Sequence, residues 1–169
     1  MRQEKKVLAC VDKSDYATHV ADYAAWAAAR LSAPIELLHV IDRHPEIAAD
    51  VDRSGSIGVD AQENLLERLS QEEGERSKVI REQGRVFLNQ LRTRCETHTG
   101  LQTDTRQRYG QLLATLKEQE SLVGMYVLGR RGESASHTRR DLGRHVEAIC
   151  RQIRRPGTSD RYATTLRAT

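Results

Sequence analysis

The first 41 residues contain the pattern that most limits how this chain can fold, a strand–helix–strand unit. Residues 7–11 (Val-Leu-Ala-Cys-Val) are apolar on both faces of an extended chain, which is typical of a strand buried in a parallel sheet. Residues 12–15 (Asp-Lys-Ser-Asp) interrupt this run with side chains that cap helices, and residues 35–41 form a second apolar run. Two parallel strands joined by a helix make a βαβ crossover, which is right-handed in nearly all sheets.

The helix between these two strands is predicted to run to about Leu31 and to bury one apolar stripe. Ser32-Ala33-Pro34 ends it, because proline cannot continue a helix. The predicted stripe consists of Tyr16, Val20, Tyr23, Ala24, Ala27 and Leu31, with Trp26 and further alanines between them.

The remaining sequence repeats this alternation of strands and helices. Residues 42–60 are polar and predict a loop, and a long helical region then extends to Gly100, with Gly74 as a candidate break or kink. Further on, the sequence predicts a polar strand over 101–109 toward a sheet edge, a short helix over 111–120, a central strand over 125–128 and a last helix over 142–153.

The order β-α-β-α-β-α-β-α predicts an α/β fold, an open and mainly parallel Rossmann-like sheet with helices on both faces. A chain of 169 residues is expected to form one domain, here over residues 1–156. Residues 157–169 are polar and basic, and they predict a flexible tail or at best a weak edge strand. The fifth strand of such a sheet is therefore expected to be atypical or missing.

Composition excludes several classes of protein. No apolar run approaches the ~20 residues that a membrane-spanning helix needs. The N-terminal residues lead into only five apolar residues, too few for the apolar region of a signal peptide, so we expect a cytoplasmic protein. Cys10, Cys95 and Cys150 are scattered and form no CxxC pair, which favours three buried reduced thiols over a zinc site or disulfides.

Charge is distributed unevenly along the chain. Residues 129–169 hold ten arginines and four acidic residues, a net charge of +6, whereas the whole chain carries +3. A basic end favours an anionic ligand. For the arginines beyond Arg144, a solvated helix face followed by a basic tail is an equally good interpretation.

The strongest candidate for a ligand site is the glycine pattern after the predicted central strand. Gly129 and Gly132 follow an apolar run, and Gly143 opens the last helix. Glycines let a backbone approach an anion, and a helix N-terminus presents free N–H groups and a positive dipole end. Asp12 and Asp42 follow the first two strands, and ligands of open α/β sheets bind at the carboxyl ends of strands. Asp12 has two compatible roles, ligand binding and capping of the first helix.

Three features together resemble the universal stress protein family. They are the strand ending in Asp12-Lys13-Ser14, the Leu37-Leu38-His39-Val40 strand, and Gly129-x-x-Gly132 followed after ten residues by Gly143. The match extends from residue 5 to about residue 156 and resembles the first halves of tandem members.

The resemblance implies a five-stranded Rossmann-like fold that binds ATP, with or without Mg²⁺. It places adenine near Asp12 and the backbone of Val40, and ribose and phosphates over the three glycines. Arg144 stands where the family has a small hydroxyl residue, so it either pairs with phosphate or obstructs the pocket. Cys10 stands where binding members often have proline. The family also pairs subunits through its fifth strand, which implies a homo-oligomer.

Three functions remain open at this point. The first is a nucleotide-binding regulatory protein of the stress response, with little or no turnover and a regulatory protein partner. The second is an interaction module of the same fold without nucleotide. The third, an adenine-nucleotide hydrolase, is disfavoured because residues 12–15 lack a Ser-Gly-Gly run. No Lys-Ser/Thr follows the glycines as in P-loop enzymes, and the histidines show no metal-ligand spacing. The arginine-rich end has few aromatic residues among its arginines, so nucleic-acid binding is also disfavoured.

Overall fold

The computed structural model describes residues 5–41, 59–132, 144–154, 157–159 and 164–166. Strands and helices alternate along them as predicted up to the last helix. The elements are β1 (Lys6–Cys10), α1 (Ala17–Leu31), β2 (Ile35–Ile41), α2 (Val59–Thr99), β3 (Thr103–Tyr109), α3 (Leu112–Gln119), β4 (Val123–Leu128), α4 (Arg144–Gln152), β5 (Gly157–Ser159) and β6 (Thr164–Leu166).

The strands form one sheet in the order β3-β2-β1-β4-β5-β6. β1 lies between β2 and β4 and is parallel to both, and β2 is parallel to β3. The predictions that β3 lies at an edge and β4 inside the sheet are therefore confirmed. The chain runs outward from β1 to β3 and then returns to place β4 on the other side of β1. The strand order reverses between β1 and β4, which makes this the topological switch point of the sheet.

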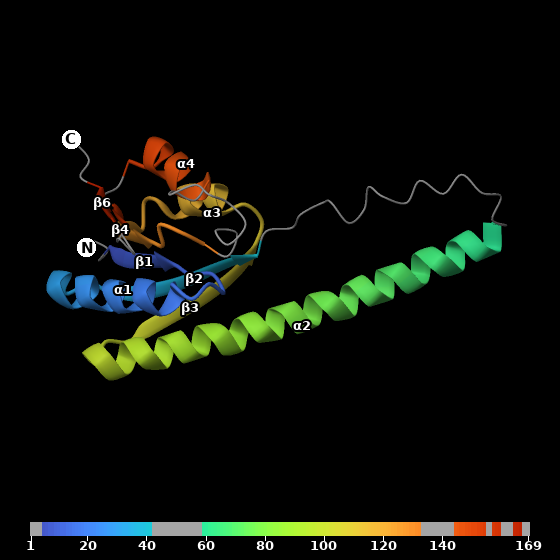
Figure 1. Cartoon of the computed structure of the whole chain (residues 1–169), viewed down its shortest axis with the longest axis horizontal. Helices are drawn as coiled ribbons and strands as arrows, with labels where there is room; N and C mark the ends of the chain where they lie inside the picture. The colour runs from blue at the N-terminus through green and yellow to red at the C-terminus, as the bar shows by residue number, and fades with distance from the viewer. Residues whose placement is uncertain (1–4, 42–58, 133–143, 155–156, 160–163, 167–169) are drawn as a thin grey trace.

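Side chains alternate between the two faces of the sheet and build a core on each. Val7, Ala9 and Leu37 belong to the cluster that includes the buried faces of α1 and α2. Leu8 and Tyr126 belong to the opposite cluster, with α3 and α4. Figure 1 shows the helices distributed over the two faces in this way, which confirms the predicted doubly covered sheet.

The buried face of α1 differs from the predicted stripe. Tyr23, Trp26 and Leu31 are exposed by 39%, 55% and 58%, so their prediction as inward-facing residues is wrong. Small residues allow a helix to approach the sheet closely, and α1 uses alanines for this contact. Its buried residues are Ala17, Val20, Ala21, Ala24, Ala25, Ala27 and Ala28.

The C-terminal residues continue the sheet. Residues 157–159 pair in parallel with β4, and residues 164–166 pair antiparallel with β5. The alternative that the fifth strand is missing is therefore wrong. The other alternative, a weak edge strand, describes β5 well, since it is only three residues long. The preceding Pro156 and the polar sequence explain its brevity, because few apolar side chains are available to pack a longer strand.

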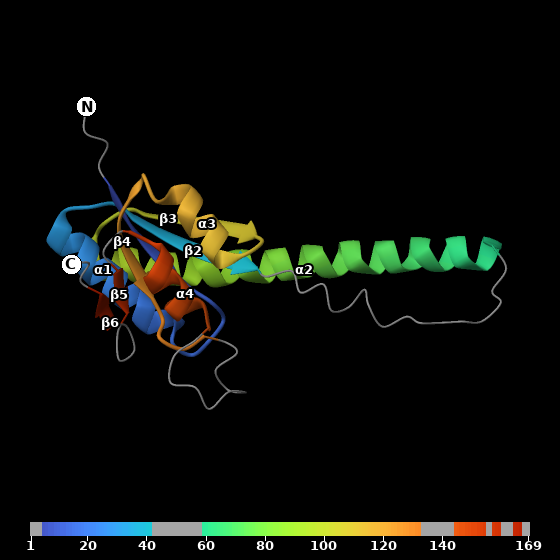
Figure 2. The same ribbon diagram turned by 90° about the horizontal axis from the view of Figure 1, so that it is seen from above.

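Helix α2 is a continuous helix of 41 residues, and it passes through Gly74 without the predicted break. No other atom lies within 4 Å of a Cβ placed on Gly74, so nothing packs against that position. Figures 1 and 2 both show the N-terminal part of α2 extending well beyond the sheet, while its C-terminal part packs beside α1. Arg94 and Asp22 join the two helices by an ion pair of 2.6 Å.

The three cysteines differ in environment. Cys95 is buried and donates to the carbonyl of Ala21 at 3.5 Å, and burial raises its thiol pKa to about 11. Burial, with the nearby Glu36 carboxylate, also raises the pKa of Cys10, which is half-buried. Cys150 is exposed, so the prediction of three buried thiols is wrong for this residue.

We expect one thiol per chain to react rapidly with a thiol reagent such as DTNB. A buried, protonated thiol is a poor nucleophile, so Cys10 and Cys95 should react only on unfolding. The measurement is the absorbance progress curve of native protein beside Cys150→Ser. A fast phase that persists in the variant would contradict the assignment.

Candidate functional site

The candidate site lies at the carboxyl edge of the sheet, where β1 and β4 end side by side. The register pairs Cys10 with Leu128, the last residues of the two strands. Asp12 and Gly129 follow within two residues, so the end of β1 and the glycine turn after β4 meet at the switch point. The structure thus brings together two sequence motifs that are over 110 residues apart.

The Asp12 carboxylate shapes the turn that leaves β1. Its Oδ1 accepts a hydrogen bond from the backbone N–H of Ser14 at 3.2 Å and another from the Ser14 hydroxyl. Helix α1 begins later, with Tyr16 at its N-cap and no side-chain capping bond. The prediction that Asp12 caps this helix is therefore wrong, since the carboxylate is used in the turn before it.

The two glycines of the turn lie where the chain packs closely. A Cβ on Gly132 would lie 2.5 Å from Oδ2 of Asp12. A Cβ on Gly129 would lie 3.0 Å from the carbonyl oxygen of Arg131 and 3.4 Å from Cγ2 of Val20. A side chain at Gly132 would therefore displace the Asp12 carboxylate.

Several cations neighbour Asp12 and the two glycines in the sequence. Arg130 and Arg131 lie within the glycine turn and are half-buried. Lys13 follows Asp12, and its ammonium group donates to Oε1 of Gln83 on α2 at 3.2 Å. Sequence analysis did not select Lys13, although it is the one cation in the turn after β1. The edge therefore combines an acceptor for hydroxyl or amino groups with positive charge suited to an anion.

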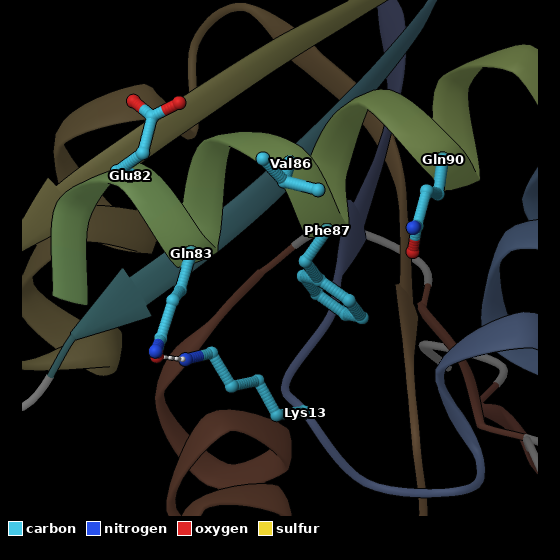
Figure 3. Close-up of a pocket in the computed structure, with 6 residues that line it drawn as sticks. All are labelled: Lys13, Glu82, Gln83, Val86, Phe87 and Gln90. Carbon is cyan, nitrogen blue, oxygen red and sulfur yellow. Dashed lines mark hydrogen bonds between the residues drawn. The ribbon is translucent and has the colours of Figure 1, made fainter. Parts of the chain in front are cut away.

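Beside Lys13 lies an open pocket of about 440 Å³ on the face of α2. Figure 3 shows Gln83, Phe87 and Gln90 pointing from α2 toward the loop that carries Lys13, while Glu82 points the other way. Val86 completes the lining. The spacing of Gln83, Phe87 and Gln90 places them on one helix face, a signal that the sequence contained and that the prediction did not use.

His39 is buried beside Phe87. Its ring contacts Phe87 edge-on, with centroids 5.7 Å apart. Burial lowers its pKa, and the Lys13 charge lowers it further, while Asp12 opposes this change. The ring is therefore neutral at neutral pH.

The other predicted site residues are described only in part. Val40 is half-buried at the end of β2, opposite Arg108 of β3. Arg144 is the first residue of α4, but its side chain lies outside the described residues, as do Gly143 and Asp42. Within the described part of the chain, no three His, Cys, Asp or Glu side chains gather into a possible metal site. In that same part, no helix is long and apolar enough to cross a membrane.

Together, the fold and the site define a class of protein. The sheet is open and doubly wound, and a carboxylate and a glycine turn meet at its switch point. This is the position where α/β proteins of this kind place their ligands.

The chain belongs to the Universal stress protein family, whose pattern its residues 4–156 match. It is 31% identical over 153 residues to the universal stress protein Slr1230 of Synechocystis. The matched region is 90% of this chain and 53% of Slr1230, so the chain spans about half the length of this curated relative.

Solved structures show the same fold. Hypothetical protein MJ0577 superposes with a TM-score of 0.64 at 17% identity, over 99% of both chains. A universal stress protein in complex with cAMP has a TM-score of 0.57 at 13% identity, over 92% of this chain and 95% of the other. The universal stress protein from Archaeoglobus fulgidus in complex with dAMP has a TM-score of 0.54 at 14% identity, over 92% and 96%. Some structural relatives therefore bind nucleotides.

Proposed function

We propose that this chain is an ATP-binding regulatory protein of the stress response. The observation that carries the proposal is the close approach of Gly132 to the Asp12 carboxylate at the switch point. The cAMP and dAMP complexes of structural relatives support a nucleotide as the ligand.

In this proposal, Asp12 accepts hydrogen bonds from a ribose hydroxyl or the adenine amino group, and the backbone of Val40 borders the adenine. Gly129, Gly132 and Gly143 allow the backbone to approach the ribose and phosphates. Helix α4 follows β4 in a parallel unit, so its N-terminus begins at the same edge and its dipole favours an anion there. Arg130, Arg131 and Arg144 add positive charge at this edge.

We propose little or no turnover of the bound nucleotide. The groups at the described edge bind and orient, and we assign none of them as a base for an attacking water. Binding would instead change contacts with a regulatory protein partner or between subunits of a homo-oligomer. The second candidate is an interaction module that binds no nucleotide, and it is favoured if the bulky Arg144 blocks the phosphate position.

We expect Asp12→Ala and Gly132→Val each to weaken ATP binding about 10-fold or more, because each removes or displaces a charged hydrogen-bond acceptor. Binding is measured by calorimetry with ATP and Mg²⁺ on protein stripped of nucleotide. Asp104→Ala and Gly74→Ala are matched controls, since Asp104 lies near the amino end of β3 and Gly74 has no neighbouring atoms.

Equal ATP affinity in wild type and both site variants would show that Asp12 and Gly132 do not form the ATP site. No heat with wild type, and no nucleotide released on denaturing freshly purified protein, would leave the interaction module as the function. The Arg144→Ser variant defines the role of the arginine. If wild type binds no ATP, binding gained in this variant identifies the arginine as an obstruction; if wild type binds, weaker binding in the variant identifies a phosphate ligand.

A further inference from the structure

The N-terminal part of α2 projects away from the sheet (Figures 1 and 2). Every described side chain from Glu67 to Arg76 is exposed. Going from the N-terminus of α2, the contacts of its described residues with β3 begin at Ser77 and Arg81. The Ser77 carbonyl accepts a hydrogen bond from the Tyr109 hydroxyl at 3.3 Å, and Arg81 lies over the Tyr109 ring. Residues 59–76 therefore extend roughly 27 Å beyond the first of these contacts.

Such an extension is not expected to be stable by itself. Isolated helices of this length are marginal in water, and Gly74 in its interior costs about 1 kcal/mol relative to alanine. Leu65, Leu66 and Leu69 recur along its sequence at helical spacing. These features indicate that the N-terminal part of α2 is stabilised by packing against a partner.

The charge along α2 indicates what that partner is. Residues 59–75 hold six acidic residues and one arginine, a net charge of −5, whereas residues 76–99 hold six basic residues and two glutamates, a net charge of +4. The helix dipole favours this polarity only within the first and last turns, so it does not explain a division that extends over the whole helix. A second copy of the same helix in antiparallel orientation would be complementary along its entire length.

The C-terminal half of α2 also offers an apolar surface for this contact. Val79 and Val86 are exposed by 55% and 47%, and Val86 and Phe87 line the open pocket beside Lys13. The sign of the charge changes between Glu75 and Arg76. An antiparallel pair centred on Arg76 places positions 65 and 66 of one copy opposite positions 87 and 86 of the other. The same register places Glu67 opposite Arg85.

We propose that two copies of this chain associate through α2, antiparallel, with the acidic extension of each seated along the basic half of the other. The pocket bordered by Lys13 and Phe87 lies within this contact. The contact borders the candidate nucleotide site at Lys13, but it does not depend on the proposed function.

Charge reversal tests this interface in the full chain. Wild type should be a dimer by light scattering after size exclusion, weaker at high salt because exposed charges are screened. One variant, Glu72→Lys/Glu73→Lys/Glu75→Lys, gives both halves of α2 a net positive charge. Another, Arg76→Glu/Arg81→Glu/Arg85→Glu, gives both halves a net negative charge. Each should be monomeric alone, and an equimolar mixture of the two should be dimeric.

A matched control is Asp104→Lys/Glu118→Lys/Glu147→Lys, which alters the net charge as much as the first variant but at exposed positions on other elements. It should remain dimeric, and circular dichroism should show native helix content in all three variants. A wild type that is monomeric at low salt, dimers that persist in both α2 variants, or a mixture that stays monomeric would overturn the proposal.

Disulfide trapping tests the orientation. In a Cys150→Ser background, Glu67→Cys chains mixed with Arg85→Cys chains should give cross-linked dimers on mild oxidation, while each alone should give few. Cross-links formed equally by either chain alone would contradict the antiparallel register.

Discussion

Replacing Lys6 by methionine should destabilise this protein by about 3–5 kcal/mol, because it breaks a buried ion pair and leaves a carboxylate behind. The Lys6 ammonium donates to Oε2 of Glu36 and to Oε1 of Gln119, both at 2.8 Å. The Glu36 side chain is only 6% exposed, and after the change its one remaining charged neighbour among the described residues is Arg106, at 3.3 Å. Urea unfolding measures the loss.

The double variant Lys6→Met/Glu36→Leu should recover most of that stability, since a buried ion pair replaced by apolar groups of similar volume is often neutral or stabilising. Arg85→Met is the matched control: it breaks the exposed Arg85–Glu82 pair and should cost at most about 1 kcal/mol. A cost for Lys6→Met no larger than that of Arg85→Met would show that the buried pair contributes little.

Substituting glutamine at two glycines of the same helix should have opposite effects. A Cβ on Gly84 would overlap the side chain of Gln107 and lie 3.1 Å from Nδ1 of His39, because α2 crosses the sheet closely at this point. Gly84→Gln should therefore destabilise by about 2–3 kcal/mol, the usual cost of overpacking a core. Gly74→Gln meets no atom within 4 Å and should raise helix content, since glutamine is the better helix former.

Thermal unfolding and far-ultraviolet circular dichroism report the two effects. The second-site change Gln107→Ala makes room beside Gly84, so Gly84→Gln should cost less in that background. The same loss of stability in both backgrounds would show that the steric clash is not with Gln107 but with His39 or the backbone.

Local patterns predicted most of the fold because they report burial directly. The strand over residues 7–11 is buried and contains only apolar side chains, and the polar edge strand β3 differs from it for the same reason. Two predictions failed where packing depends on shape. The close approach of α1 uses alanines and leaves Tyr23 and Trp26 outside, and the continuity of α2 through Gly74 is not encoded by local propensity.

The candidate site was predicted in outline, since Asp12 and the glycines were selected from the sequence. Their contact could not be predicted from local spacing, because it depends on the register of β1 with β4. The pocket was missed for a similar reason: Lys13 and Phe87 are far apart in sequence, and each has an ordinary local explanation, a solvated cation and a core aromatic residue.

The pairing of β1 with β4 also determines when the sheet can form during synthesis. Lys6 pairs with Val123 and Cys10 with Leu128. One edge of β1 therefore has no strand to pair with until residues 123–128 have been synthesised. Nascent chains that end before β4 expose the apolar edge of β1, and long-range parallel pairing is slow. Of the six described strands β1 is made first, yet its second neighbour, β4, is among the later ones.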